Sequence, residues 1–356
     1  MSLRQLGNIY RFEGALNKSL KEYARAVAIL EAVSSSDQSN KMRIRDLTLA
    51  YNSLGLAHRL TGNADEARRL FRMALSLRVD LVRSDPNNLS WKRDMTFSWN
   101  LIGDLARQEG RNAEAFESYN RAFEARKEIV SKEPTVHRWR RDLAVSWENV
   151  GDMKLLDEDY EEARIAFQES FEIRQSLATM NEYDLKRQRD KATSLRKLGE
   201  VEHLSGDPEA ARVFYLQSAQ IMERLVASYP STVAWLDDMA TLKSLFAKSY
   251  EVSDDLPSAI KHQTDAIDYR GVVLKLSPKD VKMQALSVKH YGYLALLLKS
   301  NGAVGRAREI CREIELESET LESSMLEVDA KFENTAIQRL SNYLEPSVIE
   351  FGNGCA

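Results

Sequence analysis

Residues 45–78 read RDLTLAYNSLGLAHRLTGNADEARRLFRMALSLR, and residues 93–126 read RDMTFSWNLIGDLARQEGRNAEAFESYNRAFEAR. The two stretches match at the opening Arg-Asp, at two glycines and at the closing arginine. A fixed period of roughly 20–50 residues predicts an array in which each repeat is one supersecondary unit. The same period continues through the chain, because its first glycine returns every 48 residues: Gly7, Gly55, Gly103, Gly151 and Gly199, followed by Ala247 and Ala295.

The pattern within one copy predicts two helices. Phe97, Trp99, Ile102 and Leu105 recur near the helical period of 3.6 residues. A turn follows around Gly110, and a second helical run ends before proline, which lacks the N–H that a helix interior needs. No alternation typical of strands competes with this reading. The predicted fold is therefore all-α, with antiparallel helices that are each roughly 20 residues and 30 Å long.

Other columns keep the same period and predict packing. The small residue at the glycine position indicates a close approach of the two helices of a pair. The aromatic column (Tyr23, Phe71, Tyr119, Phe167 and Tyr215) is expected to fill the groove between adjacent pairs. Arg-Asp recurs at 45/46, 93/94, 141/142 and 189/190, and each pair is expected to bridge one repeat to the next. The tryptophans at 91, 139 and 235 are expected to pack over the connections between repeats.

These columns resemble the tetratricopeptide repeat, whose pattern is a large residue, Leu-Gly, Ala, an aromatic and Ala. The second copy matches it at Tyr51, Leu54-Gly55, Ala67, Phe71 and Ala74. The usual repeat has 34 residues, so the longer period here implies longer helices. The Pro-x4-Trp-x-Arg-Asp connection resembles a long-repeat subclass met in bacterial proteins. The resemblance covers residues 2 to about 323.

The resemblance implies an α-solenoid, a right-handed superhelix of seven antiparallel helix pairs plus a C-terminal capping helix. We expect seven repeats over 1–327, with the first truncated or uncapped, a capping helix over 328–345 and a flexible tail over 346–356. The chain enters an apolar helix at Leu3 and Leu6 with no polar helix before it. A solenoid end is normally capped, so we expect either a missing N-terminal region or an end that meets a partner, self-association included.

In the tetratricopeptide family the first helices of the pairs line the concave groove, and this implies the candidate binding residues. Asn52 and Asn100 are of particular interest, because an amide both donates and accepts hydrogen bonds and so could hold a peptide backbone. The alternative interpretation is that these positions are ordinary solvated polar surface. The candidate set is Arg4, Asn8, Arg11, Asn52, Arg59, Asn100, Asp104, Arg107, Glu148, Asp152, Arg196, Glu200 and His203.

A narrower binding mode is disfavoured. Arg4 and Asn8 have the spacing with which the carboxylate-clamp subclass holds chaperone C-termini. The second-repeat asparagine of that clamp is Ser53 here, and its third-repeat basic positions are Phe97 and Leu101. We therefore do not expect binding of chaperone tails.

Composition excludes several classes of protein. The net charge of −4 supplies no basic field for nucleic acid. No apolar run reaches the roughly 18 residues of a membrane span, and the N-terminus lacks the apolar stretch of a signal peptide. Cys311 and Cys355 form no disulfide framework, as expected in a reducing cytosol, and Cys311 is expected in the core rather than as a nucleophile. These features predict a cytoplasmic protein.

No sequence motif indicates catalysis. The chain has no Gly-rich phosphate loop, no HExxH and no paired CxxC, and its five histidines lack metal-ligand spacing. We therefore expect no enzyme activity, no cofactor and no metal. The leading hypothesis is a non-catalytic scaffold that binds a peptide or protein surface in the concave groove. The alternative is a regulatory or sensor arm of a larger bacterial signalling protein, with an absent N-terminal effector domain. Nucleic-acid binding along the superhelix is a third, disfavoured hypothesis.

Overall fold

The computed structural model describes residues 2–37, 39–278, 280–314 and 316, and these residues form helices and connecting turns without a strand. A further helical run at 304–314 follows the last bounded helix. The helices are α1 (Leu3–Phe12), α2 (Leu16–Ser36), α3 (Lys41–Leu60), α4 (Ala64–Ser84), α5 (Leu89–Gln108), α6 (Asn112–Lys132), α7 (His137–Leu156), α8 (Tyr160–Thr179), α9 (Leu185–Leu204), α10 (Pro208–Ser228), α11 (Val233–Val252), α12 (Leu256–Leu276) and α13 (Val281–Ser300).

The helix boundaries repeat with the period of the sequence. From α3 to α13 each odd-numbered helix has 20 residues, and successive ones begin 48 residues apart. The even-numbered helices keep the same spacing from α2 to α12 and have 20 or 21 residues. Only α1 is shorter, with 10 residues. The predicted all-α fold of helical pairs is confirmed, whereas the right-handed superhelix and the count of seven stay predictions. The predicted capping helix 328–345 and tail 346–356 lie outside the described residues.

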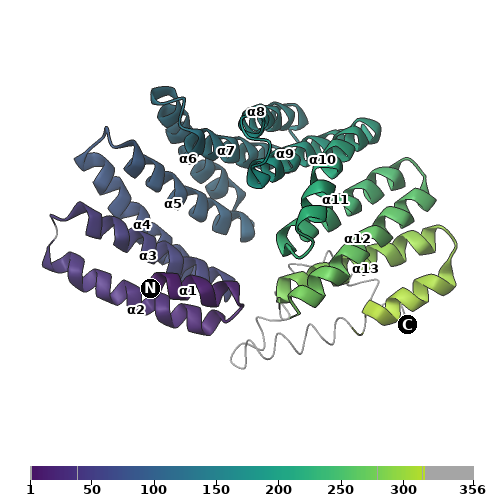
Figure 1. The fold of residues 1–356 in the computed structure, drawn as a ribbon, viewed down its shortest axis with the longest axis horizontal. Helices are drawn as coiled ribbons and strands as arrows, with labels where there is room; N and C mark the ends of the chain where they lie inside the picture. The colour runs from purple at the N-terminus through teal and green to yellow at the C-terminus, as the bar shows by residue number, and fades with distance from the viewer. Residues whose placement is uncertain (1, 38, 279, 315, 317–356) are drawn as a thin grey trace. The chain divides into compact units, whose positions relative to one another are not determined.

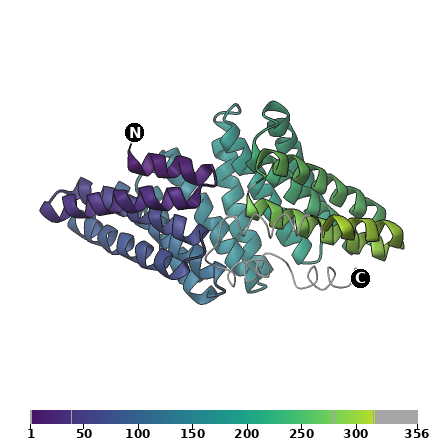
Figure 2. The same ribbon diagram turned by 90° about the horizontal axis from the view of Figure 1, so that it is seen from below.

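The chain divides into two compact units, Met1–Ile173 and Arg174–Ala356, with the boundary inside α8. In the N-terminal unit, coloured purple to blue in Figure 1, the pairs α1–α2, α3–α4 and α5–α6 follow one another, and Figure 2 shows the same succession from below. In the C-terminal unit, α9–α10 and α11–α12 are paired in the same way. The proposed domain limits stay a prediction.

The turn inside each pair needs a left-handed residue. Gly62 and Gly110 hold φ at 78° and 72°, and the same position is occupied by Glu158 and Asp254 at φ 58° and 59°. A side chain costs roughly 1–2 kcal/mol in this region because its Cβ crowds the carbonyl oxygen. The turn therefore favours glycine at this position. Where Glu158 and Asp254 occupy it, the turn has the same conformation but the protein loses that conformational energy.

The periodic glycine inside each first helix has a different role. A Cβ built at Gly55 would lie 2.6 Å from Cε1 of Phe71, which is fully buried in the partner helix α4. The expected close approach within a pair is confirmed. The aromatic column was expected between adjacent pairs, but it packs first on the glycine of its own pair. Tyr215 also reaches the next pair, where its ring lies 5.5 Å from that of Phe246.

A column of buried arginines joins the repeats. Arg126 is 2% exposed and donates through Nε to Thr96 Oγ1 at 3.0 Å, and through Nη1 to the Asp142 carbonyl at 3.0 Å and Ser146 Oγ at 2.8 Å. Arg78 repeats the arrangement one repeat earlier. Burial lowers the pKa of Arg126 to about 10, so it remains charged at neutral pH. The sequence shows that these arginines recur with the repeat, but it did not predict that they are buried and link successive helices.

The Arg-Asp column bridges successive repeats as predicted. Arg45 Nε donates to Asp94 Oδ2 at 2.5 Å, and Arg189 Nε donates to Asp238 Oδ2 at 2.6 Å, each from one first helix to the next. Of the three tryptophans expected at the connections, Trp235 packs there: its ring lies 5.7 Å from that of Tyr229, the C-cap residue of α10.

Cys311 is buried, as expected for a core residue. The other cysteine of the chain, Cys355, lies outside the described residues.

Candidate functional site

The candidate residues lie on one face of the first helices. The first-helix face of the N-terminal unit is formed by α1, α3, α5 and α7, which carry ten of the residues that the sequence singled out; the other three lie on α9 of the C-terminal unit. Most of these residues are neither fully buried nor fully exposed.

In the N-terminal unit the charges of the first-helix face are matched from one repeat to the next. Arg59 Nη1 lies 3.7 Å from Asp104 Oδ2, and Arg107 Nη1 donates to Asp152 Oδ2 at 3.4 Å. Asp104 also accepts a hydrogen bond from the Tyr119 hydroxyl at 2.8 Å. The structure therefore brings Arg59, Asp104, Arg107 and Asp152 together in one ladder across α3, α5 and α7.

All four side chains of the ladder are partly open to solvent. Arg107 is 46% and Asp104 36% exposed, and Arg59 and Asp152 are 25% and 17% exposed. Pairs of this length between partly exposed groups contribute roughly 0–1 kcal/mol each. A ligand carboxylate or amide could therefore replace an internal partner of these guanidinium groups at little cost.

The two asparagines do not have the expected role. Asn52 is 8% exposed, and its Nδ2 donates to Ser98 Oγ of the next first helix at 3.4 Å. Asn100 Oδ1, with the amide oriented so that it faces the buried arginine, accepts from Nη1 and Nη2 of Arg126 at 3.1 Å. Both amides are used in packing between helices, which removes Asn52 from the candidate surface and leaves Asn100 with limited capacity for a peptide.

The remaining candidates of the N-terminal unit lie at its ends. Asn8 Oδ1 accepts a hydrogen bond from the Tyr23 hydroxyl at 2.6 Å, and this contact fixes the orientation of the amide. Arg4 and Arg11 are half-buried on α1, and Glu148 is half-buried on α7.

In the C-terminal unit the three candidates lie within one helix. Glu200 of α9 forms an ion pair with Arg196 and another with Lys197, whose Nζ lies 3.1 Å from Oε2. Burial acts to raise the pKa of Glu200, but the two cations outweigh it, so the pKa lies below its ordinary value. His203 is half-buried, and burial followed by the nearby Lys248 lowers its pKa, which favours the neutral imidazole at pH 7.

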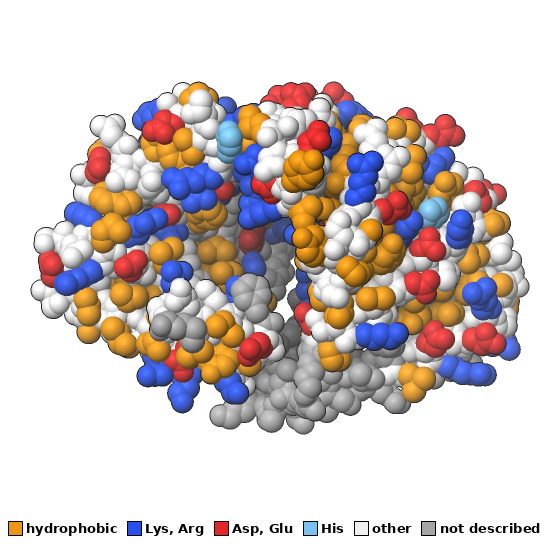
Figure 3. All heavy atoms as spheres, viewed as in Figure 1, with side chains coloured by type: hydrophobic (Ala, Val, Ile, Leu, Met, Phe, Trp, Pro, Cys, Tyr) orange, Lys and Arg blue, Asp and Glu red, His pale blue; other side chains and the backbone are white. Residues whose placement is uncertain are grey.

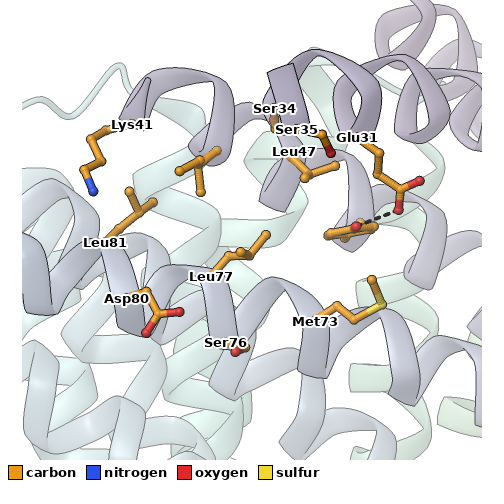
Figure 4. Close-up of a pocket in the computed structure, with 12 residues that line it drawn as sticks. Glu31, Ser34, Ser35, Lys41, Leu47, Met73, Ser76, Leu77, Asp80 and Leu81 are labelled. Atoms are coloured by element: carbon orange, nitrogen blue, oxygen red, sulfur yellow. Dashed lines mark hydrogen bonds between the residues drawn. The ribbon is translucent and has the colours of Figure 1, made fainter. Parts of the chain in front are cut away.

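Sequence reasoning missed a hollow in the N-terminal unit, shown in Figure 4. It has a volume of about 570 Å³ and is lined by residues of α2, α3 and α4. Its only sequence signal is a set of small residues at positions that are larger in the next repeat. It is lined by Glu31, Ser34, Ser35, Lys41, Ile44, Leu47, Tyr51, Met73, Ser76, Leu77, Asp80 and Leu81.

The face of the described residues seen in Figure 3 carries side chains of both charges. Over the N-terminal unit, on the left of Figure 3, basic and acidic side chains alternate with scattered apolar ones. The part of the chain that the structure describes holds no group of three or more His, Cys, Asp or Glu side chains placed to bind a metal ion. Within that same part, none of the helices is long and apolar enough to cross a membrane.

Comparison with protein families identifies the repeat. Models of the tetratricopeptide repeat match residues 47–86, 98–129 and 142–224. Each match begins inside a first helix and extends into the helices that follow it. A comparison with curated proteins found no match.

Solved structures share the fold at low sequence identity. RapI in its apo form is 13% identical, with a TM-score of 0.59, over 90% of this chain and 98% of its own. The Rap conjugation gene regulator of plasmid pLS20, solved in complex with the Phr* peptide, is 12% identical, with a TM-score of 0.54, over 91% and 74%. BtubC (BKLC) from P. vanneervenii is 19% identical, with a TM-score of 0.55, over 72% and 91%.

Proposed function

Because the chain is a tetratricopeptide-repeat protein, we propose that it is a non-catalytic scaffold that binds a peptide or a protein surface along the first-helix face. The observation that carries this proposal is the ladder of Arg59, Asp104, Arg107 and Asp152. Its ion pairs are long and partly exposed, so the groups can change partners. The Rap regulator with a bound peptide has the same fold and supports a peptide as the ligand.

The chemistry of the ladder defines the ligand that fits. Arg59 and Arg107 lie one repeat apart and present guanidinium groups, which donate hydrogen bonds to carboxylates or backbone carbonyls. Asp104 and Asp152 offer carboxylate oxygens to backbone N–H groups. An extended peptide supplies both kinds of group at regular intervals. We therefore expect a peptide segment with acidic side chains spaced to reach both arginines.

Affinity capture from a lysate of the source organism tests this proposal. One bait is the wild-type chain and a second carries Arg59→Gln and Arg107→Gln. The matched control carries Arg83→Gln and Arg121→Gln, which remove the same charge from exposed positions of the second helices in the same repeats. A partner held by wild type and control but lost from the second bait supports the proposal. Equal capture by all three baits would contradict it.

A regulatory arm of a signalling protein is the second candidate. The similarity to a Rap conjugation gene regulator favours it, although that similarity is one of fold. If it holds, the captured partner is a regulatory protein or the segment that controls one, and wild-type chain added in excess changes the activity of that partner. Self-association through the first repeat and the cytoplasmic location stay part of the proposal.

A further inference from the structure

The hollow lined by α2, α3 and α4 exists because one repeat differs from the next. Moving 48 residues along the chain, Ser34 becomes Val82 and Ser76 becomes Glu124, so small side chains stand where larger ones fill the following repeat. There, Val79 and Trp99 are partly buried and pack against an apolar cluster. At the hollow the corresponding residues are Glu31 and Tyr51. The volume of the hollow, about 570 Å³, is within the range found for ligand-binding sites.

In the following repeat, two cations occupy the position that is equivalent to the hollow. Lys92 Nζ donates to Glu128 Oε1 at 2.6 Å, which joins α5 to α6. The Arg121 guanidinium lies 4.7 Å from the centre of the Trp99 ring. At the hollow these two cations are replaced by Ile44 and Met73. The acidic position is retained, since Asp80 stands where the next repeat has Glu128.

The hollow therefore keeps the acids Glu31 and Asp80 but lacks the counterparts of Lys92 and Arg121; the cation beside it is Arg69, whose Nη1 lies 3.1 Å from Met73 Sδ and which interacts with Glu31. Asp80 lies at one end, beside Leu81, and pairs only with Arg83 at 3.4 Å among the described residues, in a pair where both side chains are more than 60% exposed. Glu31 lies at the other end and accepts from the Tyr51 hydroxyl at 2.6 Å. Lys41, the one cation in the lining, forms no ion pair with either acid among the described residues.

An unpaired buried hydroxyl adds an independent observation. Ser34 lines the hollow and is 8% exposed, and its Oγ has no hydrogen-bond partner. A buried polar atom without a partner costs roughly 1–3 kcal/mol, so a ligand that donates to it gains that amount. The apolar floor of Leu47 and Leu77 would contact an aliphatic stem.

We propose that the hollow between α2 and α4 binds an arginine side chain of a protein partner. In the partner's sequence, an apolar residue stands next to this arginine. The aliphatic stem lies against Leu47, Leu77 and Met73. The guanidinium, which has five N–H donors and stacks on aromatic rings, takes the place that Arg121 has over Trp99 one repeat later. It donates to Asp80 or Glu31 and to Ser34. This site is separate from the first-helix face.

Fluorescence anisotropy with the full chain tests this inference. The probe is a fluorescein-labelled peptide Gly-Leu-Arg-Leu-Gly with blocked ends, and its control contains citrulline, a neutral group of the same shape, in place of arginine. We expect the citrulline peptide to bind at least about ten-fold more weakly, since one charge-assisted hydrogen bond contributes roughly 1.5–3 kcal/mol. Binding of the two peptides with equal affinity, or no binding of either at millimolar concentration, would overturn the proposal.

Variants test the place of binding. Ile44→Lys with Met73→Arg restores the residues of the next repeat, and we expect this variant to lose the arginine peptide by at least ten-fold while remaining folded by circular dichroism. Glu31→Gln with Asp80→Asn is expected to weaken binding similarly. Asp65→Asn, on α4 but outside the hollow, is the matched control. Unchanged binding in the first variant would overturn the proposal.

The Arg59→Gln/Arg107→Gln chain separates this inference from the proposed function. If the arginine peptide binds the hollow, this variant retains wild-type affinity for the probe whether or not it loses its captured partner. If the variant loses the probe, the peptide lies on the first-helix face and the hollow is not its site.

Discussion

The periodic glycine of the first helix gives the sharpest test of the packing. A Cβ built at Gly199 would lie 2.5 Å from Tyr215 Cδ1 and 3.1 Å from the Ala211 carbonyl oxygen. At Gly271, in the interior of α12, the corresponding position has no atom of the described residues within 4 Å apart from the adjacent backbone of its own helix. Both glycines lie in helices of the C-terminal unit. The same Gly→Ala change is therefore expected to have opposite effects at the two sites.

The magnitudes follow from two opposed terms. Alanine in a helix interior is favoured over glycine by about 1 kcal/mol, and this gain applies at both sites. Overpacking a closed core costs roughly 1–3 kcal/mol. At Gly199 the upper part of that range applies, because Tyr215 is fully buried and a backbone oxygen limits the other side. We expect Gly199→Ala to lower the free energy of unfolding by about 1–2 kcal/mol and Gly271→Ala to raise it by about 1 kcal/mol.

Urea unfolding of the full chain, followed by circular dichroism, measures the two changes, and hydrogen exchange of α9 and α10 localises the first. Local exchange is needed because arrays of repeats do not always unfold in one transition. Tyr215→Leu removes the ring edge, so in the double variant part of the Gly199→Ala cost should disappear, giving a coupling energy of about 1 kcal/mol. If Gly199→Ala is as stable as Gly271→Ala, the close approach does not restrict this position and the reasoning is refuted.

Three further predictions concern buried and strained groups. Arg126→Met should lower stability by about 3 kcal/mol in urea unfolding, because the Asp142 carbonyl and two hydroxyls lose their donor; Arg121→Met, on the surface, should change it by less than 1 kcal/mol. Asp254→Gly should raise the melting temperature, since it relieves about 1 kcal/mol at φ 59°, and a lower melting temperature would contradict this. Burial, then Arg270, lowers the pKa of His290 to about 3 in the folded chain. The unfolded chain therefore binds the proton first, and this histidine lowers stability as pH drops below 6.5, by roughly 2 kcal/mol at pH 5; His290→Gln should reduce the fall of the urea midpoint over that range, and an unchanged fall would contradict this.

The candidate site was only partly predictable from sequence. The resemblance placed Arg59, Asp104, Arg107 and Asp152 on one face, and the structure brings these four together. It could not show that Asn52 is buried, because exposure at that position depends on how closely the next first helix approaches. The hollow lined by α2, α3 and α4 was missed because it arises where side chains of one repeat are smaller than those of the next, and no sequence motif indicates such a difference.

The sequence by itself determined the repeat, its period, the helical pairs and the small residue where two helices approach. These follow from local patterns, since helix period, turn glycines and prolines act within a few residues of the chain. Only the tertiary structure decided which polar residues are used internally. The buried arginines, the asparagines and the ion-pair ladder depend on contacts between residues 16–49 positions apart. Whether a polar group faces solvent or a neighbouring repeat is set by the packing distance between helices, which is a property of the folded array rather than of any single copy.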